Sequence, residues 1–454
     1  MATLFRPASL ALLFPLLHAA CSAPPAPGAA RPAGRDTTTL NYALRQAYAD
    51  SVDRARLAAF FAEYQARARP FQEKGNYLGE TGLLQELAAK YAGSAAVRSI
   101  TTQQIGTFAS FLGDDVEAQR RFDALEDDPP EAREGTLGLD TLEARDAVEA
   151  IVALARTHRV IFLNEAHHVP RHRALALALL PRLRELGFAW LAVETLSDQD
   201  SALNTRGYAV HTSGYYSNEP VFGELLRQAS RLGYRLVPYE PTAAPSQDAR
   251  ELGMATNLRD RIFARDSNAR VLVYAGYAHI NEAGLLGGAK PMAVQFRELT
   301  GIDPLSVDQT TMREHVDRAK EIPGYRRITG WAGREQPFVL VGRGGNPVSV
   351  RPGVNDLTVW TPPARIREGR PAWLWEVGHR EAVAIPRELC RDRDPCVIAA
   401  RRRGESPDAV AADAVLVHRG QPLPAHALGP GSYEMVARDR AGMELGRRDV
   451  EVLE

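Results

Sequence analysis

Short, uninterrupted apolar runs alternate with amphipathic segments through the middle of the chain, from about residue 139 to residue 310. The runs predict strands at 160–163, 190–193, 235–237 and 271–275. Helical periodicity predicts helices over 142–155, 171–186, 220–232, 246–265 and 291–299. A strand that is apolar throughout is covered on both faces, which is typical of parallel sheets. We therefore expect an α/β fold with a largely parallel sheet flanked by helices.

The two flanks of this region have different patterns. Apolar residues recur at spacings of three and four within 37–138, which predicts an N-terminal helical region. Beyond residue 335, apolar runs separated by turn residues predict a C-terminal mainly-β domain. Its expected strands lie at 338–341, 357–360, 373–377, 433–436 and 449–452. The predicted organisation is thus a helical region (37–138), an α/β domain (139–335) and a β-rich domain (336–454).

The N-terminus has the features of an export signal. Arg6 precedes an apolar run at 10–17, which is too short to span a bilayer. The sequence Ala19-Ala20-Cys21 resembles a lipobox, so we expect a lipoprotein-type signal peptide over 1–21 and lipidation of Cys21. A plain signal peptide cleaved near Ala20 is the alternative. Residues 22–36 then form a Pro- and Ala-rich tether, and Ser22 favours periplasmic or outer-membrane localisation through the lipid.

Cysteine usage and net charge narrow the choice of partners and chemistry. Apart from Cys21, the chain has only Cys390 and Cys396, which lie in a polar loop and predict a small disulfide in an oxidising compartment. Their spacing is not Cys-x-x-Cys, which disfavours a metal or redox role. The chain has 55 Lys and Arg against 56 Asp and Glu. Nucleic-acid binding needs clustered positive charge, so we expect no nucleic-acid partner.

Acidic and imidazole side chains follow the predicted parallel strands. Glu165 and His167 follow the first strand, Glu194 the second, Glu240 the third and His279 the fourth. The carboxyl ends of parallel strands share one edge of a sheet, and ligands bind beside that edge. We therefore expect these groups to converge there.

Buried charges in such a cluster require a cation or mutual pairing. Arg173, Arg259 and Arg261 could provide the pairing without a metal. Neutral imidazoles and carboxylates equally suit a divalent transition metal, namely Zn, Mn, Fe or Co.

The candidate roles divide between metal ligands and a general base. His167, His279 and Glu165 are the expected ligands, and Glu165 and Glu194 share the roles of ligand and catalytic base. His168 is the structural neighbour or the functional histidine in place of His167. Candidate cofactor-binding residues near the same edge are His172, Tyr239 and Tyr277. A Gly-x-Ser-x-Gly nucleophile motif beside a strand and a phosphate-binding glycine loop after the first strand are both missing from the sequence.

These motifs, in this order, resemble one known superfamily. Asn164-Glu165-Ala166-His167 with His172, then Glu194, then Gly276-Tyr277-Ala278-His279 are similar to its successive motifs, with Asn164 in place of a usual glycine. The superfamily groups erythromycin-esterase-like enzymes, ChaN-like haem-binding lipoproteins and Tiki/TraB-type proteins. Glu165 to His168 also fits the Glu-x-x-His of the esterase branch, whereas His172, the helix at 254–262 and the export signal favour the ChaN-like branch. The resemblance covers about 139–310.

What the resemblance implies is a cell-envelope metal-dependent hydrolase that cleaves an ester or amide bond of a small-molecule or peptide substrate with activated water. The alternative is a non-catalytic haem-binding lipoprotein that uses the same site. A second alternative is an inactive scaffold whose β-rich domain binds a partner.

Overall fold

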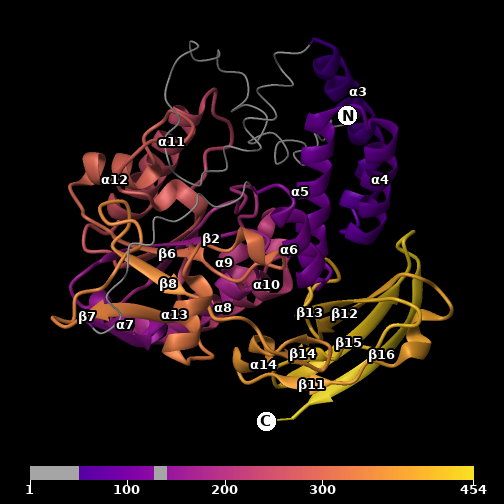
Figure 1. Ribbon diagram of the computed structural model, residues 1–454. Helices are drawn as coiled ribbons and strands as arrows, with labels where there is room; N and C mark the ends of the chain where they lie inside the picture. Colours follow the sequence, from indigo (N-terminus) through magenta and orange to yellow (C-terminus); the bar gives the residue numbers. More distant parts are fainter. Residues whose placement is uncertain (1–50, 127–140, 454) are drawn as a thin grey trace.

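The computed structural model describes residues 51–126 and 141–453 (Figure 1). The predicted signal peptide, the tether and Cys21 lie outside the described residues. Among the helices of the described ranges, none is both long enough and apolar enough to cross a membrane.

Four antiparallel-packed helices form the N-terminal part of the described chain. Their bounds are α3 (Ser51–Gln72), α4 (Tyr77–Lys90), α5 (Ala95–Phe111) and α6 (Asp115–Asp123). Each of the last three begins at a capping side chain that accepts a backbone N–H of the first turn: Asn76, Ser94 and Asp114. Phe60, Leu84 and other apolar residues at helical spacing form the shared core of α3, α4 and α5.

An eight-stranded sheet forms the centre of the molecule, in the order β1-β7-β8-β6-β2-β5-β3-β4. The strand bounds are β1 (Leu142–Asp146), β2 (Val160–Glu165), β3 (Trp190–Val193), β4 (Arg235–Pro238), β5 (Val271–Gly276), β6 (Leu305–Met312), β7 (Phe338–Gly342) and β8 (Leu357–Trp360). Neighbouring strands from β8 to β4 run parallel, whereas β7 is antiparallel to both β8 and β1. The predicted α/β fold class is confirmed.

Helices cover both faces of the sheet (Figure 1). One apolar core joins a sheet face to α7 (Ala147–Ala155), α8 (Arg171–Glu185) and α10 (Pro220–Arg231). A second core joins the other face to α11 (Gln247–Leu258) and α12 (Met292–Thr300). Shorter elements connect them: α9 (Leu203–Arg206), η4 (Tyr216–Asn218), η5 (Arg259–Phe263), η6 (Tyr277–Ile280), η7 (Arg318–Lys320) and α13 (Tyr325–Ala332).

The structure corrects three details of the sequence prediction. The helix expected over 142–155 begins as strand β1 and becomes helical only at Ala147. The domain boundary expected at residue 335 cuts through the large sheet, because β7 and β8 return to it from beyond that point. The strand expected at 373–377 is a short helix, α14 (Trp373–Glu376). A short apolar run fits a buried helical turn as well as a strand, so the pattern could not distinguish them.

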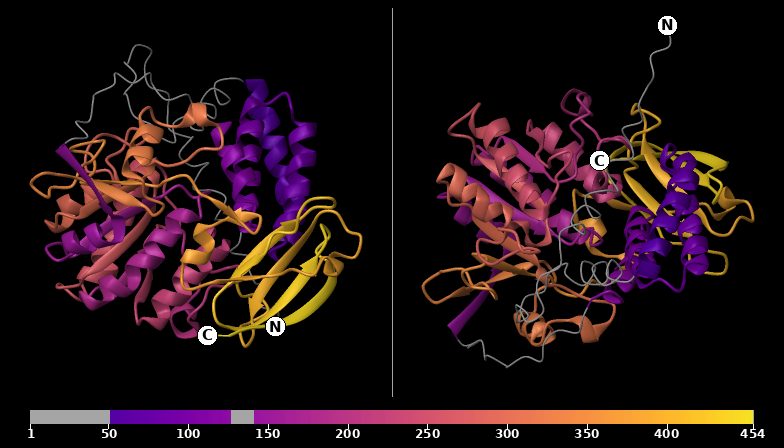
Figure 2. Two further views of the ribbon diagram at one scale, coloured as in Figure 1. Left: turned by 60° about the horizontal axis from the view of Figure 1, so that its bottom comes forward. Right: turned by 90° about the horizontal axis from the view of Figure 1, so that it is seen from above.

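The C-terminal part is mainly antiparallel β-structure. A four-stranded sheet has the order β13-β12-β15-β16, and β11 pairs with β14. The bounds are β9 (Ile366–Arg367), β10 (Arg370–Pro371), β11 (Glu381–Val383), η8 (Arg387–Cys390), β12 (Cys396–Arg402), β13 (Asp413–Val417), β14 (His426–Leu428), β15 (Gly431–Arg438) and β16 (Glu444–Val452). This sheet lies beside the N-terminal helices in both further views (Figure 2), where Asn76 donates to the carbonyl of Arg440 at 3.0 Å.

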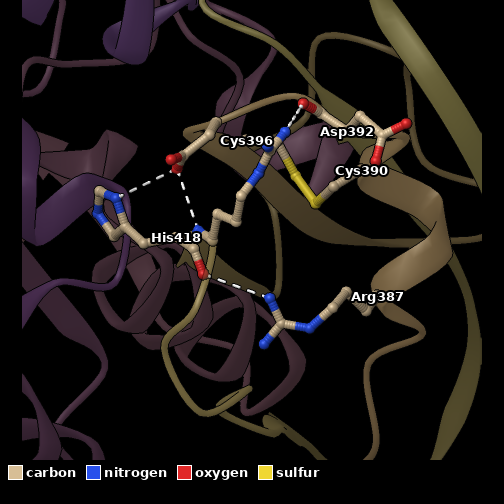
Figure 3. The surroundings of a disulfide bond; sticks show 7 residues. Arg387, Cys390, Asp392, Cys396 and His418 are labelled. Atoms are coloured by element: carbon tan, nitrogen blue, oxygen red, sulfur yellow. Dashed lines mark hydrogen bonds and ion pairs between the residues drawn. A yellow bond between two sulfur atoms is a disulfide. The ribbon is translucent and has the colours of Figure 1, made fainter.

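A disulfide joins Cys390, at the end of η8, to Cys396, at the start of β12, with Cα atoms 5.8 Å apart (Figure 3). Next to it, Arg387 donates to the backbone carbonyl of His418 at 3.3 Å. These contacts fix the loop that leads into the four-stranded sheet.

Candidate functional site

The carboxyl ends of β2, β3 and β5 bring the predicted acidic residues together. Glu165 ends β2 and lies opposite Gly276, the last residue of β5. Glu194 follows β3, and its backbone N–H donates to the carbonyl of Tyr274 in β5 at 3.1 Å. His279 lies in η6, directly after β5. Parallel pairing therefore places residues from three distant stretches beside one strand end.

Glu165 is paired at both carboxylate oxygens. Arg173, in the first turn of α8, donates to Oε1 and Oε2 at 2.8 Å each. The Nδ1 atom of His167 lies 2.8 Å from Oε1. Burial by itself raises the pKa of Glu165, but Arg173 and His167 more than offset this and hold the pKa well below its usual range. Glu165 is therefore a charged, rigidly held partner of His167, and no carboxylate oxygen is left free of protein contacts.

Glu194 forms a second ion-paired group with Arg250 of α11. The guanidinium lies 2.8 Å from Glu194 and 2.6 Å from Glu240, and the backbone N–H of Gly276 donates to the other oxygen of Glu194. Burial raises the pKa of Glu194, whereas His279, His167 and Arg250 lower it, with a net result of about 2. Glu194 is thus ionised at neutral pH.

His279 lies between two carboxylates. Its Nδ1 is 2.8 Å from Glu251, which is fully buried and also accepts the backbone N–H of Met292 at 2.7 Å. Its Nε2 is 3.5 Å from Glu194 and 3.1 Å from Arg250. Burial lowers the pKa of His279, but Glu251 and Glu194 raise it by a larger amount, so the net shift is upward.

The two adjacent histidines have different environments. His167 is 13% exposed and stacks on Tyr216 with ring centroids 3.7 Å apart. His168 is fully buried and stacks on Phe122 of α6 at 3.8 Å. Burial among neighbouring cations holds the pKa of His168 well below its usual value. His167 is therefore the histidine of the strand-end site, and His168 is part of the contact between α6 and the sheet.

Gly276 allows His167 and Glu194 to approach each other. A Cβ atom at this position would lie 2.3 Å from Nε2 of His167 and 3.1 Å from Oε2 of Glu194. The residues after the two strands, Thr195 and Tyr277, have positive φ angles of 65° and 45°. Such angles cost energy in a residue with a side chain and are concentrated at functional sites. The strand ends are thus held in a geometry that local preference alone disfavours.

The predicted cofactor-binding residues lie deeper than the site. His172 is buried, and its Nδ1 accepts the backbone N–H of Ala166 at 2.9 Å. Burial lowers its pKa to about 3. The hydroxyl of Tyr239 donates to the carbonyl of Tyr274 at 3.1 Å, beneath the strand ends, and Tyr239 is fully buried. Only Tyr277 borders His167, with its ring edge-on at 5.2 Å.

Asn164, where the resembling motif has glycine, connects three segments. Its side chain donates to the carbonyl of Tyr277 and to Asp308, both at 2.9 Å, and accepts the backbone N–H of Gln309 at 2.8 Å. The turn after β2 is therefore fixed to β6 and η6 by this side chain.

A separate group of side chains could hold a metal ion. In the described part of the chain, the ligand-type atoms of Asp123, Glu126 and His315 lie within 4.8 Å of one another. The Nδ1 of His315 is 2.7 Å from Asp123, and Arg313 donates to Glu126 at 2.6 Å. The sequence does not predict this group, because Asp123 and Glu126 lie in a helical region without any recognisable ligand motif.

Negative charge exceeds positive charge at the strand ends. Two guanidinium groups, those of Arg173 and Arg250, face five carboxylates there, which belong to Glu165, Glu194, Glu219, Glu240 and Glu251. Of the arginines expected from the sequence to provide pairing, Arg173 does so, whereas Arg261 pairs with Asp198. Arg250 and Glu251 were not singled out. The signal that the sequence offers is their position. They lie one helical turn into the helix predicted over 246–265, which follows a strand end.

Comparisons with known proteins give limited information. No protein-family model and no curated protein matches the chain. The solved structure of the type III effector HopBA1 is 15% identical with a TM-score of 0.26, and the match covers 38% of this chain and 90% of that one. A structure described as bacterial protein toxins is 13% identical with a TM-score of 0.30, and covers 55% and 65% of the two chains. At these TM-scores neither likeness supports an inference about function.

Proposed function

We propose that this protein is a metal-dependent hydrolase of the cell envelope that cleaves ester or amide bonds with activated water at the strand ends. One observation carries the proposal: two imidazoles approach Glu194, and each has its Nδ1 held by a buried carboxylate. Glu165 holds His167 at 2.8 Å, and Glu251 holds His279 at 2.8 Å. Export and lipidation at Cys21 would place this activity at the periplasmic face of the outer membrane.

The donor set fits a divalent transition metal. Metal-binding histidines usually donate the second ring nitrogen to a carboxylate, and His167 and His279 have that arrangement. Glu194, which is ionised, lies 3.5 Å from Nε2 of His279, and its Oε2 and Nε2 of His167 both border Gly276. A 2+ ion also suits the excess of carboxylates over guanidinium groups. We therefore assign His167, His279 and Glu194 as the ligands of one ion, which is Zn, Mn, Fe or Co. A metal held there would polarise water or the scissile carbonyl.

Glu165 then acts as a positioning residue instead of a ligand. Its oxygens are occupied by Arg173 and His167, so it fixes the ring orientation and tautomer of His167. Because the Nδ1 proton faces Glu165, Nε2 has the free lone pair that a ligand or a general base needs. Arg250 keeps Glu194 ionised, and its side chain is 18% exposed, so it could also bind a carbonyl or carboxylate of the substrate.

The test is metal analysis combined with hydrolysis assays on protein that lacks residues 1–21. We expect about one equivalent of metal, loss of activity toward a panel of chromogenic esters and amides on chelation, and recovery on adding metal back. His167→Ala and Glu194→Gln should each lower both metal content and activity by about 100-fold. The matched control is His418→Gln, in the C-terminal domain, which should change neither. A folded protein without stoichiometric metal that remains active would refute the metal assignment, and an inactive metal-loaded protein would refute hydrolysis.

A metal bound at Asp123, Glu126 and His315 would complicate this measurement. His315→Gln separates the two groups, because it removes a ligand there without touching the strand ends. Metal that survives His315→Gln but is lost in His167→Ala belongs to the proposed site. Haem titration distinguishes the haem-binding alternative: a Soret band lost on replacing His167, His279 or Tyr277 would support that alternative in place of hydrolysis.

A further inference from the structure

The junction between α10 and the C-terminal β-domain contains a second buried charged cluster. Glu224, Arg227 and Arg231 lie on one face of α10, at spacings of three and four residues. Arg402, at the end of β12, reaches this face from the β-domain, and Arg380 lies directly before β11. Glu405 contributes the second carboxylate.

The carboxylates are shared among several guanidinium groups. Glu405 binds Arg227 at 2.8 and 2.6 Å. Glu224 lies 3.2 Å from Arg231 and 3.4 Å from Arg402, and 3.8 Å from Arg227. Four guanidinium groups therefore face two carboxylates, which leaves two positive charges uncompensated.

Arg380 is a buried arginine with a nitrogen that lacks a hydrogen-bond partner within the described ranges. It is only 8% exposed, and its Nη1 atom has no hydrogen-bond partner in the described part of the chain. Nη1 of Arg227 and Nε of Arg402 are likewise buried without hydrogen-bond partners among the described residues. A buried guanidinium without a partner is strongly unfavourable, and arginine side chains can present their N–H groups in pairs to the oxygens of an anion.

The backbone brings Arg380 to this cluster. Glu381 pairs with Leu428 in the strands β11 and β14, so Arg380 lies beside Gly429. The carbonyl of Gly429 accepts the hydroxyl of Tyr433 at 2.8 Å, and the guanidinium of Arg402 lies over the ring of Tyr433 at 5.1 Å. Arg380 also lowers the pKa of Glu224, together with Arg402, Arg227 and Arg231, although burial raises it. Arg231 is 51% exposed and is the member of the cluster that borders solvent.

We propose that Arg380, Arg402 and Arg231 bind a doubly charged oxyanion, a phosphate group, at the junction of α10 and the β-domain. Two negative charges match the two uncompensated positive charges of the cluster. Forked guanidinium groups suit phosphate oxygens better than a single ammonium group does. The bound group connects residues of the α/β unit to residues of the β-domain, so it stabilises their contact. The site is separate from the strand ends, and its existence does not depend on the proposed hydrolase activity.

The experiment compares thermal unfolding and calorimetric titration in phosphate-free buffer and in inorganic phosphate at constant ionic strength. We expect phosphate at 100 times its dissociation constant to raise the wild-type melting temperature by about 3 °C. Arg380→Gln and Arg402→Gln should each weaken phosphate binding about tenfold or more. The matched control, Arg447→Gln on the outer strand β16, should leave binding unchanged. Acetate, a monoanion, should bind at least about tenfold more weakly than phosphate.

A crossover in stability identifies the role of Arg380. Without phosphate, Arg380→Gln should melt at the same temperature as the wild type or higher, because it removes an unpaired charge. With phosphate, the wild type should become the more stable protein. Lower stability of Arg380→Gln in both buffers, or equal phosphate affinity in all variants, would overturn the proposal. Phenyl phosphate in a parallel titration identifies the source: tighter binding than inorganic phosphate indicates a phosphate group carried by a larger molecule, and weaker binding indicates the free ion.

Discussion

The strand ends and the α10 junction are both buried clusters of charge, but they have opposite excess. At the strand ends, five carboxylates share two guanidinium groups, and at the junction four guanidinium groups share two carboxylates. A folded chain tolerates buried charge where partners balance it. The sign of the excess is therefore the basis of the two proposals, a cation for the first cluster and an anion for the second.

The largest effect should come from breaking the pairing at the strand ends. Arg173→Met leaves Glu165 and Glu219 buried without their guanidinium, and we expect the free energy of unfolding to fall by about 3–5 kcal/mol. Urea denaturation measures this. Arg182→Met is the matched control in the same helix, because its pair with Glu149 is exposed, and it should cost less than about 1 kcal/mol. Adding Glu165→Gln to Arg173→Met should restore part of the loss. Equal effects of both arginine substitutions would contradict the balance argument.

A buried carboxylate with one unpaired oxygen, elsewhere in the molecule, provides a reference for uncompensated charge. Asp115, at the start of α6, is buried, and its Oδ2 has no partner within the described ranges. Burial raises its pKa from 3.8 to about 7, although Arg370 opposes the shift. The folded state thus favours the protonated form. The resulting stability is complete below about pH 3.8 and is lost as the pH rises through about 7.

Asp115→Asn should accordingly stabilise the protein most at high pH. At pH 8 we expect a gain of up to about 4 kcal/mol in the free energy of unfolding, and at pH 4 almost none. Urea denaturation at the two pH values measures the difference. The exposed Asp303→Asn should show no such pH dependence. If Asp115→Asn instead destabilises the protein at pH 8, the carboxylate has a favourable partner, and Asp115 is not an example of an uncompensated charge.

Sequence reasoning predicted which residues converge, because parallel strands place their carboxyl ends along one edge wherever they lie in the sequence. Glu165, Glu194 and His279 meet for that reason. It could not predict which charged side chains form ion pairs with one another. Arg250 and Glu251 come from α11, whose orientation depends on packing against the sheet, and an arginine inside a helix pattern looks like any exposed arginine.

The order of the strands in the large sheet could not be predicted from the sequence either. A run such as that of β7 shows that a strand exists but not which neighbour it chooses, so the last two strands of the large sheet were assigned to a separate domain. The choice between His167 and His168 was open for a related reason. Only the position of Phe122, from a distant helix, distinguishes a buried ring from one at the strand ends.

The approach of His167 to Glu194 can be disturbed without changing any charge. Gly276→Ala places a methyl group 2.3 Å from Nε2 of His167, which must move, whereas the φ of −81° suits alanine. We expect a loss of about 1–3 kcal/mol of stability and a larger loss of metal binding and activity. Gly330→Ala is the control, because nothing lies within 4 Å of its added methyl group. Unchanged metal affinity in Gly276→Ala would argue against His167 and Glu194 as joint ligands.

The smallest expected change in stability comes from the aromatic ring that stacks on His167. Tyr216 stacks on His167 at 3.7 Å, much as Tyr433 lies against Arg402, and the neighbouring Tyr215 is bound by Gln104 of α5. The N-terminal helices therefore hold Tyr216 over the imidazole. Tyr216→Leu should cost about 1 kcal/mol of stability, the value of one aromatic stacking contact, and Tyr216→Phe should cost less because it keeps the ring.

The informative measurement for this ring is the rate at which diethyl pyrocarbonate modifies His167, followed by peptide mass spectrometry. If Tyr216 shields the Nε2 side of the ring, Tyr216→Leu should raise that rate several-fold, whereas Tyr216→Phe and the wild type should react alike. The fully buried His168 should stay unmodified in all three proteins and so report that the fold is intact. Equal rates at His167 would mean that the reagent reaches the imidazole past Tyr216 without any movement of the ring, and that the helices serve only to stabilise the strand ends.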